Sequence, residues 1–317
     1  MTLKSLSIGK ANLDEFSATL MGLAENDKNI LAVTSDSRGS GKLTLFGEKF
    51  PDQIIEVGIA EQNLVGVAAG LASAGKNVFA ASPACFLTTR SLEQIKNDVA
   101  YSNQPVTLVG ISAGVSYGAL GSTHHSIHDV AVLRAINNIQ IVVPADNFEA
   151  HYALLAAAKS SKPVYLKFGK KAMPDLPRTE EHFEIGKASV ICQGDEVAFI
   201  ACGETVAPAY EAARLLESKG ISAEVISMHT INPLDKEMVI SVAKKCRVII
   251  TVEEHCVNGG LGEACASLLM QEKLFVPFKI VGFPDEETVT GSQTEIFSYY
   301  GISAEGLLQT ALNLLDR

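Results

Sequence analysis

Residues 53–74, with the sequence QIIEVGIAEQNLVGVAAGLASA, decide the fold class. The β-branched run at 53–57 predicts a short buried strand, and the spacing of apolar residues over 61–74 predicts a helix. A strand that leads through a short turn into a helix is the repeating unit of a parallel sheet. Glu61 falls at this turn, at the carboxyl edge of the sheet, where such folds bind ligands. Taken alone, Glu61 also fits an acidic residue that complements the dipole of a helix N-terminus.

The predicted helix at 61–74 has almost no large side chains. Gly66 and Gly70 lie four residues apart on it, so both point to one face. Another backbone can approach such a face closely because glycine has no side chain. The sequence therefore predicts a tight contact there with another helix or another subunit.

Strand and helix patterns alternate over nearly the whole chain, in two series. In the first series we expect strands at 30–34, 53–57, 78–81, 106–110, 140–143 and 164–168, and helices at 11–25, 61–74, 92–101 and 147–159, the last capped by Asp146. A polar stretch with prolines at 170–181 then reads as a linker. In the second series we expect strands at 196–201, 223–227, 247–252 and 276–281, and helices at 205–219, ending near Gly220, at 235–243 and at 261–271. The pattern predicts an α/β protein with two consecutive doubly wound domains.

Composition limits the function classes. The 317 residues are 47% hydrophobic and 20% charged, and 36 acidic against 26 basic side chains give a net charge of −10. This charge disfavours nucleic acid as a partner because phosphate backbones attract basic surfaces. We expect no membrane role, because the apolar runs are short and rich in Gly and Ala. The six cysteines form no CxxC pair and the first residues, MTLKSLSIGK, lack a signal-peptide pattern, so we expect a cytoplasmic protein.

Two further segments are candidates for chemistry. Residues 114–129, GVSYGALGSTHHSIHD, combine three glycines with three histidines, which suits a substrate loop. His124 and His128 could share a helical face and bind zinc, but no cysteine lies nearby and no third ligand is evident, so we expect no metal site. Phe86 stands at the end of a predicted strand, and taken alone it fits the core.

In this order, these segments resemble the carboxyl-terminal two-thirds of transketolase and its relatives over essentially the whole chain. Residues 1–175 resemble the pyrimidine-binding domain, 176–188 form a linker, and 189–317 resemble the C-terminal domain. The motifs that carry the resemblance are GIAEQN at 58–63, FL at 86–87 with EQI at 93–95, GSTH at 121–124, LRAI at 133–136, EEH at 253–255 with GGLG at 259–262, and GFPD at 282–285 with GSQ at 291–293.

The resemblance implies thiamine diphosphate as the cofactor. The family holds the diphosphate and Mg²⁺ through an amino-terminal domain marked by Gly-Asp-Gly and paired asparagines, and no Gly-Asp-Gly occurs here. We therefore expect this chain to be the C-terminal subunit of a split transketolase. It would be active only with a separate N-terminal subunit that carries this motif, as an α2β2 heterotetramer in which the partner holds the divalent cation.

The resemblance also assigns roles to residues of this chain. Glu61 matches the catalytic glutamate that binds a ring nitrogen of the cofactor's aminopyrimidine, and Phe86 matches the aromatic that stacks on that ring. Ile59 matches the residue that supports the bent cofactor, and Asp36 matches an aspartate near the thiazolium. His124 matches a catalytic histidine that hydrogen-bonds the substrate's oxygens.

The substrate end departs from the family pattern. Leu120 replaces an aspartate that many transketolases use to contact a substrate hydroxyl, and a leucine cannot make that hydrogen bond. Lys10 and Lys167 align with phosphate-binding arginines, with Phe168 an alternative at the second position, and Ser112 aligns with a phosphate-pocket histidine. A lysine keeps the charge but not the two-pronged geometry of arginine. We expect a sugar substrate, phosphorylated as in the pentose phosphate pathway, or a branched or sulfonated analogue.

Three alternatives stay open. The β subunit of a 2-oxoacid dehydrogenase shares both domains and the split arrangement, although the GSTHH loop favours transketolase. Deoxyxylulose phosphate synthesis is a third relative, but it normally uses one continuous chain. A non-catalytic regulatory homologue would keep the fold without needing Glu61 and His124.

Overall fold

The computed structural model describes residues 6–178 and 181–316. Its elements in chain order are β1 (Ile8–Ala11), α1 (Asn12–Asn26), β2 (Ile30–Thr34), α2 (Thr44–Lys49), η1 (Pro51–Gln53), β3 (Ile54–Glu56), α3 (Glu61–Ser73), β4 (Asn77–Pro83), α4 (Ala84–Arg90), α5 (Leu92–Gln94), the π-helix η2 (Ile95–Tyr101), β5 (Val106–Ile111), η3 (Gly118–Leu120), α6 (Asp129–Arg134), β6 (Gln140–Val142), α7 (Asn147–Lys159), β7 (Val164–Lys167), β8 (Ala172–Pro174), β9 (Ser189–Cys192), β10 (Val197–Ala201), η4 (Gly203–Thr205), α8 (Val206–Glu217), β11 (Ala223–Ser227), β12 (Thr230–Asn232), α9 (Lys236–Lys245), β13 (Val248–Cys256), α10 (Leu261–Gln271), β14 (Phe278–Phe283), α11 (Gln293–Tyr299) and α12 (Ala304–Leu315).

The first unit contains a sheet in the order β12-β6-β7-β5-β4-β2-β3, which is parallel except at β12. All of its strands except β12 come from the first half of the chain. Side chains alternate between its two faces. On β4, Val78 and Ala80 pack with the helices α3 and α4, whereas Phe79 and Ala81 pack with α1 and α7. Helices therefore cover both faces, which confirms the predicted doubly wound arrangement.

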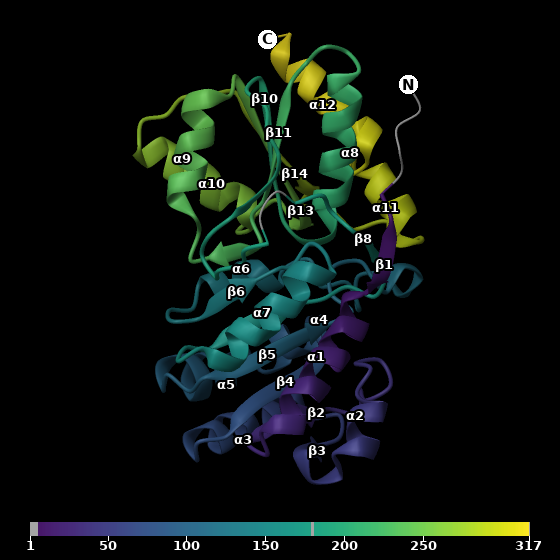
Figure 1. The fold of residues 1–317 in the computed structure, drawn as a ribbon, viewed down its shortest axis with the longest axis vertical. Coiled ribbons are helices and arrows are strands. Elements are labelled where there is room, and N and C mark those ends of the chain that lie inside the picture. The colour runs from purple at the N-terminus through teal and green to yellow at the C-terminus, as the bar shows by residue number, and fades with distance from the viewer. Residues whose placement is uncertain (1–5, 179–180, 317) are drawn as a thin grey trace.

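The second half builds a sheet in the order β14-β13-β10-β11-β9, parallel except at β9. On β10, Phe199 faces a cluster formed with α8, α11 and α12, and Ile200 faces the cluster that includes α9 and α10. This unit also has helices on both faces, as Figure 1 shows in its upper part. Two doubly wound α/β units are thus present, as expected.

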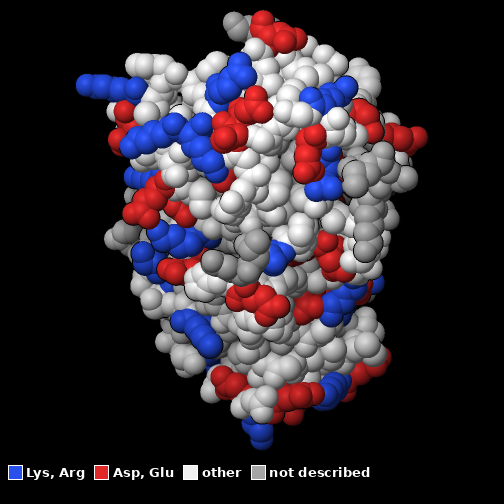
Figure 2. Space-filling model, turned by 45° about the horizontal axis from the view of Figure 1, so that its top comes forward, with Lys and Arg blue, Asp and Glu red and all other residues white. Residues whose placement is uncertain are grey.

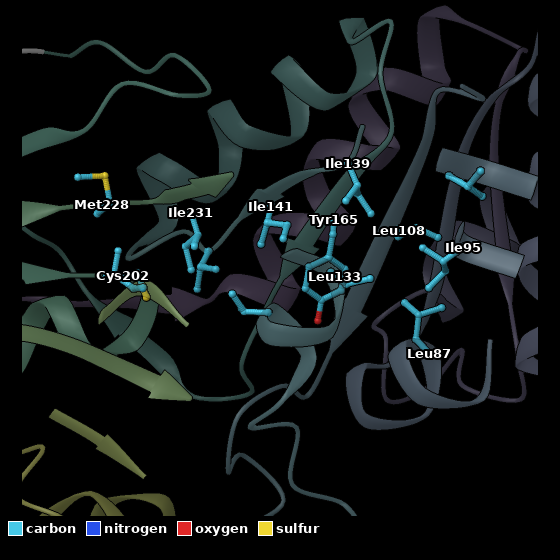
Figure 3. Packing of buried hydrophobic residues seen from close by; sticks show 14 of the residues in the cluster. Leu87, Ile95, Leu108, Leu133, Ile139, Ile141, Tyr165, Cys202, Met228 and Ile231 are labelled. Carbon is cyan, nitrogen blue, oxygen red and sulfur yellow. The ribbon is translucent and has the colours of Figure 1, made fainter. Parts of the chain in front are cut away.

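The two units share a core. One apolar cluster runs from Leu87 and Leu108 in the first unit through Tyr165 to Cys202 and Met228 in the second (Figure 3). The strand β12 belongs to the second half of the chain, yet it pairs antiparallel with β6 and forms the edge of the first sheet. The pairing of β12 with β6 and the shared apolar packing therefore hold the units together.

The stretch expected to be only a linker contains structure. Strand β8 lies within 170–181 and pairs antiparallel with β1, with Ile8 opposite Pro174. The chain thus returns to the N-terminal segment and pairs with it before the second unit begins. Pairing between distant segments is not visible in local composition, so the polar character of 170–181 suggested a simple connection.

Charges are interspersed on the surface. Figure 2 shows basic and acidic side chains mixed on that face, without a large basic patch. Among residues 6–178 and 181–316, no helix combines the length and the apolar character needed to cross a bilayer.

Candidate functional site

The carboxyl ends of the parallel strands bring the predicted cofactor residues to one edge of the first sheet. Glu61 begins α3, after a short turn that follows the end of β3 at Glu56. Phe86 lies in the first turn of α4, which follows β4 without a loop. Asp36 lies just beyond β2. Parallel strands place these three residues at the same sheet edge because their carboxyl ends meet there.

Glu61 is buried and paired with an arginine that the sequence did not single out. Its side chain is 4% exposed, and Arg90 Nη1 donates to both carboxylate oxygens at 3.0 and 3.1 Å. The same guanidinium lies over the ring of Phe86, with Cζ 4.1 Å from the ring centroid. Arg90 therefore joins the predicted catalytic acid to the predicted stacking aromatic.

His124 reaches this group from the loop between β5 and α6. Its ring meets the ring of Phe86 edge to face at 5.4 Å and that of Tyr117 at 5.3 Å. Its Nδ1 lies 2.9 Å from the hydroxyl of Thr123. The ammonium of Lys170 lies 4.6 Å from the centre of the Tyr117 ring. The structure thus brings Glu61, Phe86 and His124 together in one continuous set of contacts.

Ile59 stands beside this group, with 74% of its surface exposed. A depression in the surface opens next to the ion pair and is lined by Ile59, Ala60, Glu61, Gln62, Asn63 and Arg90. The role of Ile59 in supporting the cofactor stays a prediction.

Asp36 is exposed, and its backbone is held in place by Glu56. Its φ of 51° lies in the left-handed region, which Asp tolerates better than most residues. The backbone N–H groups of Asp36 and Gly58 both donate to Glu56 Oε1, at 2.7 and 2.9 Å. Glu56 therefore ties the loop after β2 to the turn before Glu61, a role that the sequence did not reveal.

Lys167 lies away from this group, inside the molecule. Its ammonium is 2.8 Å from Asp129 and also donates to the backbone oxygens of Ser126 and Glu254. These three acceptors use all three of its N–H donors, so none is left for a substrate phosphate. The alternative at this alignment position, Phe168, is fully buried in the core.

Lys10 and Ser112 also make their contacts elsewhere. Lys10 is half exposed and forms an ion pair with Glu15 at 2.6 Å. Ser112 is buried with a φ of 52°, and its hydroxyl has no hydrogen-bond partner among the described residues. A substrate role for either residue stays a prediction.

The EEH motif at 253–255 is buried where the two units meet. Glu253 accepts hydrogen bonds from the backbone N–H groups of Leu261 and Gly262 and so caps α10. Burial raises its pKa to about 7. Burial, reinforced by nearby Lys167, lowers the pKa of His255 to about 4, so this histidine is neutral at physiological pH.

Glu254 and Glu204 share one donor. Gln293 Nε2 lies 2.8 Å from Glu254 Oε1 and 2.7 Å from Glu204 Oε2. Burial and the neighbouring Glu204 carboxyl raise the pKa of Glu254 to about 8, and burial raises that of Glu204. The Glu254 carboxyl fills the space where a side chain on Gly114 would stand, and it accepts the N–H of Val115. This carboxyl pair therefore links the second unit to the loop that carries His124.

One of these features had a signal in the sequence. Arg90 lies four residues after Phe86 on a helix, a spacing that can put a cation over an aromatic ring. Glu253 had no such signal, because it lies on β13, eight residues before the first residue of the helix that it caps. The carboxyl pair had none either, because Glu204 lies on η4 and Glu254 lies on β13, far apart in the sequence.

The residues present fit the pyrimidine half of the expected cofactor. A buried carboxylate faces an open depression, and a half-buried aromatic ring lies beside it. A carboxylate can accept a hydrogen bond from a protonated ring nitrogen, and an aromatic face can stack on a planar ring. Within the described residues, no group of three or more His, Cys, Asp or Glu side chains could hold a metal ion.

Comparison with known families identifies the family of this chain. The sequence matches the transketolase pyrimidine-binding domain over residues 11–175 and the transketolase C-terminal domain over residues 186–307. The chain therefore belongs to the transketolase family, a family of transferases that use thiamine diphosphate.

Individual relatives narrow the class. The chain is 45% identical over 303 residues to a subunit of the apulose-4-phosphate transketolase of Phocaeicola vulgatus, covering 95% of this chain and 96% of that one. It is 37% identical over 291 residues to the protein of the same name in Actinobacillus succinogenes, covering 92% and 94% of the two chains. A solved structure described as a split-gene transketolase, an inactive beta4 tetramer, matches with a TM-score of 0.87 at 33% identity, covering 97% of this chain and 99% of that one. This chain corresponds to the C-terminal subunit of a split transketolase, which confirms the family prediction.

Proposed function

We propose that this chain, together with a separate N-terminal subunit, transfers a two-carbon ketol unit from a phosphorylated ketose to an aldose. The observation that carries the proposal is the contact set at the sheet edge. There the buried Glu61 carboxylate is joined through Arg90 to the Phe86 ring, and this ring meets the His124 imidazole. Thiamine diphosphate supplies the carbon nucleophile in this chemistry.

Each residue of this set has a separate task. Glu61 accepts a hydrogen bond from the ring nitrogen of the aminopyrimidine and so keeps a proton available at that ring. Phe86 stacks on the pyrimidine, and Ile59 and Asp36 line the remaining path of the cofactor. His124 donates or accepts a hydrogen bond at a substrate oxygen, because its imidazole is half-buried and held against two aromatic rings.

The partner subunit completes the active site. We assign the diphosphate and its Mg²⁺ to the partner's Gly-Asp-Gly and paired asparagines, in an α2β2 heterotetramer. The solved relative built only from β chains is described as inactive, which supports a requirement for a second kind of chain. The six cysteines are free of disulfides, which supports a reducing, cytoplasmic setting.

Apulose 4-phosphate is the first donor to test. The two relatives compared above are named for it. Leu120 also supports an unusual donor, because this exposed apolar residue lies in the His124 loop where many transketolases place an aspartate. A donor that lacks the hydroxyl which this aspartate would contact loses no hydrogen bond when the aspartate is absent.

The test is reconstitution. The N-terminal subunit with the Gly-Asp-Gly motif, sought in an adjacent reading frame, is mixed with this chain, thiamine diphosphate and Mg²⁺. Apulose 4-phosphate, xylulose 5-phosphate and 6-deoxy-6-sulfofructose are compared as donors with one aldose acceptor. We expect transfer from the first donor by the complex and none by either chain alone. Substantial transfer by this chain alone would contradict the half-enzyme proposal, and activity only with a 2-oxoacid and a lipoyl acceptor would replace it.

A further inference from the structure

Arg90 makes two contacts that a cofactor pyrimidine would also need. Its planar guanidinium lies 4.1 Å above the Phe86 ring, and it donates to both oxygens of Glu61 at 3.0 and 3.1 Å. A group that lies over an aromatic ring and donates to a carboxylate beside it uses the same two partners that a protonated aminopyrimidine would use.

We propose that Arg90 holds the pyrimidine position while the cofactor is absent, and that it must leave Phe86 and Glu61 when the aminopyrimidine binds. This inference rests on the proposed function. The other residues of the site would bind the cofactor, whereas Arg90 would compete with it.

The exposure of the two partners fits a group that can leave. Glu61 is 4% exposed and fixed at the start of α3, whereas the Arg90 side chain is 47% exposed and stands at the end of α4. A long side chain with half its surface in water can move outward and keep its charge hydrated. Glu61 has no such path, so the acid stays in place and the arginine moves.

The contact with Arg90 also stabilises the Glu61 carboxylate while the cofactor is absent. A buried carboxylate without a partner is unfavourable, and Arg90 supplies that partner until another donor arrives. The arginine end of this pair is half exposed, and the contacts of a half-exposed cation with a carboxylate and with an aromatic ring are individually modest, so a ligand with good stacking and a good donor can displace them.

The experiment uses the isolated chain and a neutral probe, 4-amino-5-hydroxymethyl-2-methylpyrimidine. A neutral probe is needed because the loss of a positive charge at residue 90 would by itself favour binding of the thiazolium cation. The chain has no tryptophan, so binding is measured by titration calorimetry. We expect Arg90→Ala to bind the probe about 3- to 30-fold more tightly than the wild type, which corresponds to the loss of one half-exposed ion pair and one half-exposed cation–π contact.

The matched control is Arg214→Ala. Arg214 is also 47% exposed and pairs with Glu217 at 2.8 Å, but it lies on α8 in the second unit. This variant removes the same charge, and we expect it to leave probe binding unchanged. The double variant Glu61→Gln with Arg90→Ala should lose the gain, because the carboxylate that receives the pyrimidine is gone.

Thiamine diphosphate binding to the reconstituted complex is measured with the same variants. Suppose that Arg90→Ala binds no more tightly than the wild type, while Glu61→Gln abolishes the binding seen in the wild type. This result overturns the competition by Arg90 and leaves the proposed function intact. If Glu61→Gln does not change binding, or if no variant binds in either assay, the cofactor role of this site is overturned and the inference with it.

Discussion

Lys167 and Asp129 form an ion pair inside the protein, and their burial decides how much each side chain contributes to stability. The side chains are 5% and 0% exposed. Burial raises the pKa of Asp129, but the charges of Lys167 and His255 and the hydrogen bonds from Lys167 and Tyr165 together more than offset burial and hold the pKa below its usual value. Tyr165 donates to the other carboxylate oxygen at 2.7 Å. This lysine is thus part of the framework behind the His124 loop.

Replacement of Lys167 tests this structural role. We expect Lys167→Met to lower the free energy of unfolding by about 3–5 kcal/mol, because it leaves a buried carboxylate unpaired. Lys10→Met, at a half-exposed ion pair, should lower it by less than about 1 kcal/mol. Urea denaturation of both variants measures the difference. A small effect of Lys167→Met on stability combined with a raised KM for the sugar would instead favour the substrate role expected from the sequence.

Glu61 is the residue on which the proposed chemistry depends. We expect Glu61→Ala to lower turnover of the reconstituted complex by about 10²- to 10⁴-fold, the range typical for loss of a positioned proton-transfer group. His124→Ala changes the substrate end of the same contact set and should raise KM for the donor more than it affects cofactor binding. Steady-state kinetics with calorimetry of thiamine diphosphate separates the two. An unchanged rate in Glu61→Ala would remove this carboxylate from the mechanism.

The family motifs led to residues that the structure places in one set of contacts. Phe86 meets His124 directly and is joined to Glu61 through Arg90, whereas the roles of the three motif residues stay predictions. The pairing of Arg90 with Glu61 and the partners of Lys167 were not foreseen, because these partners lie on elements that are distant in sequence. A charge in a sequence does not show whether another charge already compensates it.

Among the elements, α3 combines the site with a bare helical face. Its residues Asn63, Gly66, Gly70 and Ser73 follow one another at helical spacing, and Gly70 is exposed with open space where a side chain would stand. Asn63 on this face and Ile59, which precedes the helix, both line the depression beside Glu61. An exposed face of such small residues suits close contact with a second backbone.

A larger side chain on this face should interfere with assembly but not with folding. We expect Gly70→Leu to keep or slightly increase the stability of the isolated chain, since glycine is about 1 kcal/mol less favourable than alanine within a helix. It should weaken association with the N-terminal subunit at least about tenfold, because one unaccommodated leucine can cost more than about 1.4 kcal/mol at a packed contact.

Gly22→Leu is the control for this change. Gly22 lies on α1, is also exposed, and also has open space around it. It offers the same gain in helix propensity without touching α3. Analytical ultracentrifugation of mixtures with the partner compares the two variants. If both associate like the wild type, the face of α3 is not an interface.

Elements with a clear local pattern were predicted closely, and those defined by distant pairing were not. Strand β2, helix α7 and helix α10 begin and end where the sequence indicated. Strands β8 and β12 have three residues each, and their existence depends on β1 and β6. Helix α11 was missed although its capping box, Ser292 with Glu295, is a local signal.

At the scale of the whole molecule, the two units depend on each other through a shared core and a buried polar junction. The apolar cluster is continuous from α3 to α10. Beside it, Glu254 from β13 accepts the N–H of Val115, and Gln293 from α11 bridges it to Glu204. Carboxyl groups that are this close and this buried are most favourable when at least one carries a proton.

The junction should therefore make stability depend on pH. Burial, with the Glu204 charge adding to it, raises the pKa of Glu254 from 4.5 to about 8 in the folded protein. The folded state thus holds a proton that the unfolded chain releases above pH 4.5. The stabilising contribution is complete below that pH and is lost as the pH rises toward about 8, so the free energy of unfolding should fall across this range.

Glu254→Gln removes this titration and keeps an oxygen that accepts from Val115 and Gln293. We expect its free energy of unfolding to change less between about pH 5 and about pH 8.5 than that of the wild type, so that the variant gains stability relative to the wild type as the pH rises. Glu48→Gln, on the exposed face of α2, should follow the wild-type curve. Urea denaturation of the three proteins at several pH values gives the slopes. Parallel curves for wild type and Glu254→Gln would show that Glu254 is ionised in both states, and the two units would then be joined by the apolar core without help from a shared proton.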